Sequence, residues 1–211
     1  NVALMYVLAV AGIDVFGVIV GGWASNSKYA VLGSLRTCAQ MISYEIPMGF
    51  SVIGVVMLAQ SMSLVDIVEA QAGLWNVVYQ PLGFFVFFVA AIAEAQRIPF
   101  DLPEADGDLG AGYHTEYSGM RFSFFMISEY LILGLMSALI VILFFGGWHG
   151  APIPLPGPVW FLLKVSFFIW VFMWIRFTFP RYRYDQLMTI GWKVLLPLSL
   201  ANILITGIFF A

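Results

Sequence analysis

Residues 94–122 read EAQRIPFDLPEADGDLGAGYHTEYSGMRF, and they are the most polar stretch of an otherwise apolar chain. They hold six of its twelve Asp and Glu residues, and Arg97 and Arg121 bracket five of these acids. Apolar runs that suit a bilayer precede and follow the stretch. From composition alone it is either a solvated loop with ordinary turn chemistry or a segment with a functional role.

The overall composition indicates an integral membrane protein. The 211 residues are 62% hydrophobic and 10% charged, whereas soluble domains have about 25% charged residues. A net charge of −3 argues against nucleic acid as a partner. Cys38 is the single cysteine, which excludes an intrachain disulfide, and we expect it to be an apolar packing residue. His114 and His149 are far apart with no cysteine nearby, so no metal site is predicted.

Six apolar runs are long enough to cross about 30 Å of hydrocarbon at roughly 1.5 Å per residue. They lie near residues 2–22, 40–60, 81–96, 124–146, 158–179 and 190–210. Spans of this length must be helices, because the bilayer core offers no water to the backbone. We therefore predict one all-α polytopic membrane domain over residues 1–211, with about six transmembrane helices and an acidic cytoplasmic-side loop at 97–123. The chain opens in an apolar run without a charged leader, so we expect a chain cut at its N-terminus rather than a signal peptide.

Basic residues predict the orientation of these spans. The loops near 61–80 and 147–157 contain no Lys or Arg. Eight of the nine basic residues fall on the other side: Lys28, Arg36, Arg97, Arg121, Arg176, Arg181, Arg183 and Lys193. The positive-inside rule makes that side the cytoplasm, or the mitochondrial matrix. Lys164 is the exception, inside the fifth run, and it either snorkels to the interface or continues a buried polar path.

Acidic residues inside the apolar runs are the strongest functional signal from the residues alone. Asp14, Glu45 and Glu129 lie within runs, and Glu94 lies at the end of one. An ionised group at mid-membrane costs from about 2.5 to over 10 kcal/mol, so these acids should be paired, hydrated or protonated. All four fall in the half of the bilayer next to the acidic loop, and carboxyls joined by water suit a proton relay. The alternative is that each pairs with an arginine or a helix N-terminus for structure alone.

The sequences of several stretches resemble those of a known family. These are RIPFDLPE at 97–104, EYSGMRF at 116–122, GWASNSKY at 22–29, QMISYE at 40–45 and PRYRYDQLM at 180–188. They resemble the quinone-proximal membrane subunit of NADH:quinone oxidoreductase, respiratory complex I, in the family's order and over nearly the whole chain. That family begins with two further spans and a helix on the membrane surface, which this sequence does not show.

The resemblance implies a membrane subunit that forms part of the quinone-binding cavity and couples quinone reduction to proton translocation. The residues implied for the quinone cavity and coupling loop are Arg36, Arg97, Phe100, Asp101, Glu104, Asp106, Asp108 and Glu116. The relay would comprise Asp14, Glu45, Glu94 and Glu129. Partner docking would use Lys28, Arg121, Arg176, Arg181, Arg183 and Asp185. Asp106 and Asp108 stand where many relatives have Glu, and Asp14 is at a variable position, which weakens those three assignments.

The sequence contains no haem ligand set, flavin motif or iron–sulfur cysteine pattern. We therefore expect no cofactor, metal ligand or catalytic residue in this chain, which would act only as one member of a multi-subunit translocase. The resemblance implies that partner subunits carry FMN and iron–sulfur clusters and that quinone is the substrate. Partners would be the soluble quinone-site subunits, the antiporter-like membrane subunits and membrane lipid, in the bacterial inner membrane or, alternatively, the mitochondrial one.

Two other functions remain open at this point. A membrane-bound hydrogenase uses a related subunit without a quinone, but close agreement with RIPFDLPE and EYSGMRF favours the quinone enzyme. An independent ion transporter would suit the intramembrane acids, but the sequence shows no internal repeat and no paired broken helices.

Overall fold

The computed structural model describes residues 2–101, 112–114, 116–150 and 156–209, and within these ranges the chain is helical with no strand. The elements in chain order are α1 (Ala3–Gly12), α2 (Asp14–Ala24), α3 (Lys28–Ala59), α4 (Leu64–Ala70), α5 (Asn76–Tyr79), α6 (Pro81–Glu94), the 3₁₀ helix η1 (Gly112–His114), α8 (Met120–Phe144), α9 (Gly157–Thr178), α10 (Tyr184–Thr189), the π-helix η2 (Ile190–Leu195) and α11 (Leu196–Phe209).

Within the described residues, five helices are long and apolar enough to cross a membrane. They cover Ala3–Ala24, Lys28–Ala59, Met120–Phe144, Gly157–Thr178 and Tyr184–Phe209, and Pro81–Glu94 is a shorter apolar helix. The prediction of an all-α membrane protein is confirmed. The helix over Ala3–Ala24 is interrupted only at Ile13, between α1 and α2.

The predicted spans leave residues 24–39 and 180–189 as connecting loops, and both stretches are in part helical. Helix α3 begins at Lys28, whereas the predicted span begins near residue 40, so Arg36 lies on a helix. Its first turns are amphipathic, with Ala30, Gly33 and Thr37 buried at helical spacing. A search for uniformly apolar runs misses such an extension because only one of its faces is apolar.

The expected loop at 180–189 is the second correction. Residues 184–189 form α10, and its start is stabilised by a hydrogen bond from the Arg183 backbone N–H to Gln186 Oε1 at 3.2 Å. Asp185 in the first turn adds a favourable charge at the positive end of the helix dipole. Arg183 and Asp185 thus mark a helix start.

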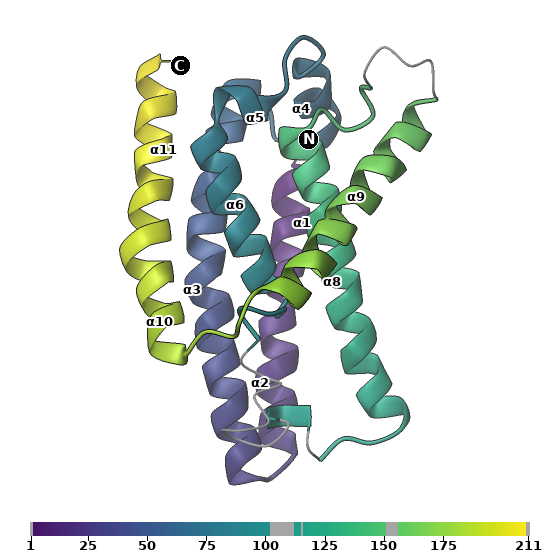
Figure 1. Ribbon diagram of the computed structural model, residues 1–211, viewed down its shortest axis with the longest axis vertical. Coiled ribbons are helices and arrows are strands. Elements are labelled where there is room, and N and C mark those ends of the chain that lie inside the picture. Colours follow the sequence, from purple (N-terminus) through teal and green to yellow (C-terminus); the bar gives the residue numbers. More distant parts are fainter. Residues whose placement is uncertain (1, 102–111, 115, 151–155, 210–211) are drawn as a thin grey trace.

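Helix α3 is the centre of the bundle, packed against α2, α6 and α11, while α9 crosses obliquely outside α8 (Figure 1). Phenylalanine rings join α6, α8 and α9: Phe88 stacks on Phe172 at 5.4 Å between centroids, and Phe84 meets Phe144 edge-on at 5.6 Å. The turn between α2 and α3, η1 and the start of α8 share one end of the molecule, and α4 and α5 lie at the other (Figure 1). The membrane orientation predicted from the basic residues is not tested by this arrangement.

Lys164 occupies a cage of backbone carbonyls just beyond the end of α8. Its Nζ donates to the carbonyls of Phe145 at 2.7 Å, Gly147 at 3.1 Å and His149 at 2.6 Å. The ammonium also lies 5.0 Å from the Trp75 ring centroid. These contacts favour an interfacial, structural role for Lys164 over a place in a relay, because its three donors are engaged at the connection after α8.

Replacing Lys164 with methionine is expected to destabilise the protein by about 1–3 kcal/mol, because carbonyls in a partly buried site lose their donor. The measurement is the thermal unfolding temperature of the purified protein in detergent. Lys164→Arg, which keeps the charge and donors, should lie between the methionine variant and the wild type. A methionine variant as stable as the wild type would show that water satisfies the carbonyls.

Candidate functional site: a buried carboxylate cavity

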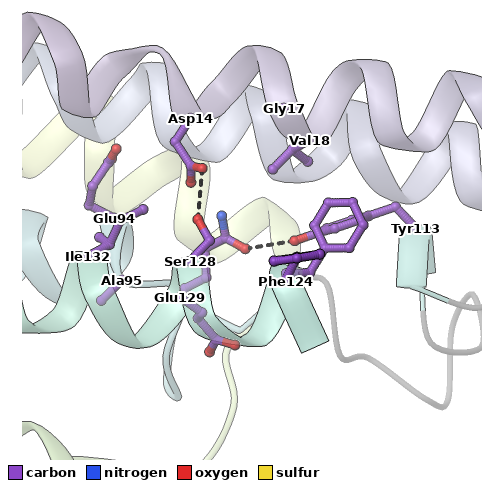
Figure 2. Close-up of a pocket in the computed structure, with 12 residues that line it drawn as sticks. Asp14, Gly17, Val18, Glu94, Ala95, Tyr113, Phe124, Ser128, Glu129 and Ile132 are labelled. Carbon is purple, nitrogen blue, oxygen red and sulfur yellow. Dashed lines mark hydrogen bonds between the residues drawn. The ribbon is translucent and has the colours of Figure 1, made fainter. Parts of the chain in front are cut away.

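A cavity of about 220 Å³ lies between α2, the end of α6, η1 and α8 (Figure 2). Its polar lining residues are Asp14, Glu94, Gln96, Tyr113, Ser128 and Glu129. The chain thus brings residues from four separate segments to one place. Three of the four predicted relay acids, Asp14, Glu94 and Glu129, line this cavity.

Asp14 and Ser128 face each other across the gap between α2 and α8. Ser128 Oγ donates to Asp14 Oδ1 at 3.1 Å, and Figure 2 shows this contact as a dashed line. Asp14 is the first residue of α2, where the positive end of the helix dipole favours a carboxylate. The break at Ile13 therefore creates a place where an acid is tolerated within an apolar span.

Glu94 is the most deeply buried acid of the cavity. It is the last residue of α6 and is 2% exposed. Within the described part of the chain, its Oε2 has no hydrogen-bond partner. A buried carboxyl oxygen without a partner is costly, and water in the adjacent cavity is the natural source of one.

Glu45 lies outside the cavity but within electrostatic range of Glu94, as does Asp14. A Cβ added at Gly12 would lie 2.6 Å from Glu45 Oε1, so the absence of a side chain at Gly12 lets this carboxylate approach the break between α1 and α2. Glu45 also lines an apolar groove of about 470 Å³ between α1 and α3. Asp14, Glu45 and Glu94 therefore gather around that break, from three different helices.

Glu129 differs from the other acids because it has a cationic partner. Arg97 Nε lies 3.0 Å from Glu129 Oε1, and Arg97 is 4% exposed. The Arg97 guanidinium carbon also lies 4.4 Å from the centroid of the Tyr130 ring. Figure 2 shows the Glu129 carboxylate on the opposite side of α8 from the Asp14–Ser128 contact. Of the two interpretations of the buried acids, proton relay or pairing with an arginine for structure, the geometry at Glu129 fits the pairing.

The segment after Arg97 packs into the protein rather than into solvent. Phe100 is 4% exposed, and its ring meets that of Tyr44 edge-on at 5.4 Å. Asp101 is 3% exposed and forms an ion pair with Arg181 at 2.9 Å. The Tyr182 backbone N–H donates to the carbonyl of Pro99 at 3.2 Å. The segment before α10 thus covers the start of the acidic stretch, and a fully solvated loop is wrong for residues 97–101.

Glu104, Asp106 and Asp108 lie outside the described residues. The other predicted residues that the structure describes do not line the cavity. Arg36 is exposed on α3, with its guanidinium carbon 6.0 Å from the Tyr184 ring centroid. Arg176 is half-buried on α9. The exposed members are Lys28, Glu116, Arg121, Arg183 and Asp185.

Several residues of the site were not predicted from the sequence. Ser128, Gln96 and Tyr113 line the cavity, and the Tyr113 hydroxyl donates to Gln96 Oε1 at 3.4 Å. Ser128 could have been identified from the sequence, since it is a polar residue next to Glu129 in an apolar run. Gln96 and Tyr113 carried none, because their roles depend on contacts between segments that are distant in sequence.

His114 was expected only to be outside any metal site, and the structure buries it in an aromatic group. Its ring lies 4.0 Å from that of Tyr113, 5.4 Å from Phe125 and 5.8 Å from Phe122, and the residue is 7% exposed. Burial lowers the pKa of His114 to about 4, against the opposing effect of the negative charge of Asp101. The imidazole is therefore neutral at pH 7.

Acidification is expected to loosen η1. When η1 detaches, His114 regains a pKa near 6.5 and binds a proton that it cannot bind when buried. The stability of the docked state is thus full above about pH 6.5 and declines as the pH falls toward 4. Hydrogen exchange of residues 112–114 and 116–118 in the purified protein, corrected for intrinsic rates, should accelerate over that range. His114→Asn should remove the acceleration, and its persistence in that variant would assign it to another group.

Comparisons with known proteins agree with this architecture. The sequence pattern of the family described as NADH dehydrogenase matches residues 1–207. A relative from Rhizobium meliloti, named as a subunit of NADH-quinone oxidoreductase, is 77% identical over 211 residues, which cover 100% of this chain and 64% of that protein. A relative from Rhizobium etli with the same name is 77% identical over 208 residues, or 99% of this chain and 61% of the relative.

A more distant relative has a similar match. The corresponding NADH-quinone oxidoreductase subunit of Geobacillus thermodenitrificans is 57% identical over 210 residues, which cover 99% of this chain and 63% of that protein. The chain therefore spans somewhat less than two thirds of the length of these relatives. With a family match over nearly its full length and this helical architecture, the chain belongs to the NADH dehydrogenase family.

Proposed function

We propose that this chain is the larger part of a membrane subunit of a bacterial proton-translocating NADH:quinone oxidoreductase, and that it couples quinone reduction to proton movement through buried carboxylates. One observation carries the proposal: acidic residues from α2, α6 and α8 line one cavity, next to a polar segment that is itself packed into the protein. The relatives named as NADH-quinone oxidoreductase subunits support the choice of enzyme.

Water in the cavity would connect the relay. A volume of about 220 Å³ holds several water molecules at roughly 30 Å³ each. Protons would then pass between Asp14, Glu94 and Glu45 by way of water, with each carboxylate taking up a proton from one side and then releasing it to the other. The ion pair of Arg97 with Glu129 would respond to charge at the 97–121 segment, because Arg97 belongs to that segment and Glu129 to the cavity lining.

Quinone reduction itself would take place beside the polar segment. Conversion of a quinone to a quinol takes up two electrons and two protons, and we propose that the electrons come from iron–sulfur clusters and FMN in partner subunits. Arg36, Arg97, Phe100, Asp101 and Glu116 are the proposed contacts or supports of the quinone cavity within the described residues, and Glu104, Asp106 and Asp108 complete the set.

The polar face beside the polar segment would dock the soluble subunits. Lys28, Arg121 and Arg183 are exposed there, with Arg176 and Arg181 nearby, and an exposed pair joins Arg183 to Asp185 at 3.3 Å. Exposed charges contribute little to stability but favour encounter with a complementary surface. The antiporter-like membrane subunits would receive the protons, and the bacterial inner membrane is the proposed location.

Purification of the native complex through this chain in mild detergent tests the assignment. FMN and iron–sulfur clusters together with inhibitor-sensitive NADH:quinone reduction are the expected result. Nickel and hydrogen evolution without quinone activity would instead place the chain in a membrane-bound hydrogenase. Ion transport by the isolated chain in liposomes would favour an independent transporter.

A further inference from the structure

Gln40 holds together the two ends of the segment that carries Glu94 and Arg97. It lies on α3 and is fully buried, at 0% exposure. Its Nε2 donates to the carbonyl of Ala93 at 3.1 Å and to the carbonyl of Phe100 at 2.7 Å. One amide group therefore binds the last turn of α6 and the residue before Asp101 to the same point on α3.

The segment between these two carbonyls is a turn that caps α6 and leads into the acidic stretch. Helix α6 ends at Glu94, and Gln96 adopts a positive φ of 50°. A turn from the Phe100 N–H to the Arg97 carbonyl, at 2.8 Å, closes the far end. Backbone hydrogen bonds from Gln96 and Arg97 to the carbonyls of Ala93 and Ile92 fix Arg97 to the end of α6, and the two hydrogen bonds from Gln40 fix that end and Phe100 to α3.

The chemistry at Gln40 indicates that its donor function matters. Its Oε1 has no hydrogen-bond partner within the described residues. A buried amide oxygen without a partner costs about 1–3 kcal/mol, which an apolar side chain of similar size would avoid. Gln80, at the start of α6, has the same unpartnered Oε1 within the described residues, so at both positions the amide is kept for its two donor contacts.

The next turn of α3 strengthens the same contact. Tyr44 lies one turn beyond Gln40, its ring packs on Phe100, and its hydroxyl donates to the carbonyl of Leu187 at 2.9 Å. Glu45 follows directly on the same helix. A displacement of Phe100 would therefore act on the part of α3 that carries Glu45.

We propose that Gln40 is a positioning residue for coupling: it holds residues 93–100 against α3, so that a displacement at the acidic segment reaches both the Glu94 cavity and Glu45. This inference rests on the proposed function. Gln40 takes no part in proton transfer, because its amide does not titrate.

The test compares Gln40→Met with Gln80→Met in the assembled enzyme. Gln80 is a matched control at the opposite end of α6: it is 2% exposed, and its Nε2 donates to the Gly54 carbonyl at 2.9 Å and to Thr206 Oγ1 at 2.8 Å. Two quantities are measured, the number of protons translocated per NADH in proteoliposomes and the hydrogen exchange of residues 93–100. Gln40→Met should lower the proton yield by about twofold or more, equivalent to at least ~0.4 kcal/mol of lost coupling, and should accelerate the exchange.

Gln80→Met should leave both quantities unchanged, even where it lowers thermal stability. Should Gln40→Met fail to assemble, Gln40→Asn keeps the amide donors on a shorter side chain, and an intermediate loss of proton yield is expected. Accelerated exchange with a wild-type proton yield would overturn the inference, since Gln40 would then be purely structural. A Gln40→Met variant that matches the wild type in both measurements would overturn the inference too. In that case a loss of proton pumping in Glu94→Gln would still support the proposed function.

Discussion

Replacing Glu94 with glutamine is expected to lower proton translocation by the assembled enzyme by about tenfold or more. Glu94 is the buried acid at the centre of the site, and glutamine keeps its size and polarity but cannot take up and release a proton. Because its Oε2 has no partner among the described residues, the substitution breaks no hydrogen bond seen in the structure. The loss should therefore appear in pumping rather than in assembly.

The measurement is proton uptake or release per NADH oxidised in proteoliposomes, together with the yield of assembled enzyme. Glu69→Gln is the control, since Glu69 is an exposed acid on α4 at the other end of the molecule. A Glu94→Gln enzyme that pumps at the wild-type level would remove Glu94 from the relay and would leave the proposed function without its central group.

Replacing Arg97 with methionine should have the largest effect on stability, about 3–5 kcal/mol. The substitution leaves the mostly buried Glu129 without its cation, and it also removes the contact of the guanidinium with the Tyr130 ring. Thermal inactivation of the assembled enzyme is the measurement. Quinone reduction should fall as well, because the segment that Arg97 holds is the proposed border of the quinone cavity.

A double variant separates charge from packing. Arg97→Met with Glu129→Gln should recover much of the lost stability, because the carboxylate that loses its cation is then replaced by a neutral amide. Arg183→Met is the control, since its pair with Asp185 is 81% and 72% exposed, and exposed pairs contribute about 0–1 kcal/mol. If the double variant is no more stable than Arg97→Met alone, the ion pair is not what Arg97 contributes.

Hydropathy and charge in the sequence were enough to predict an all-α membrane protein, because the bilayer imposes one strong rule: a long apolar span must be helical. The same rule identified the acids, since Asp14, Glu45 and Glu129 are costly where they stand. It failed at the start of α3 and at α10, where one apolar face packs on neighbouring helices. At these two places the apolar side chains are buried against other helices instead of in lipid.

Only the tertiary structure decided how the acids differ from one another. Depth along the helices placed all four in the same half of the bilayer, but it did not show that Glu129 pairs with Arg97 while Glu94 has an oxygen without a partner. The ion pair of Asp101 with Arg181 and the hydrogen bonds of Gln40 each join residues more than fifty positions apart. Such contacts depend on how the helices pack, and the local sequence around either partner carries no signal of them.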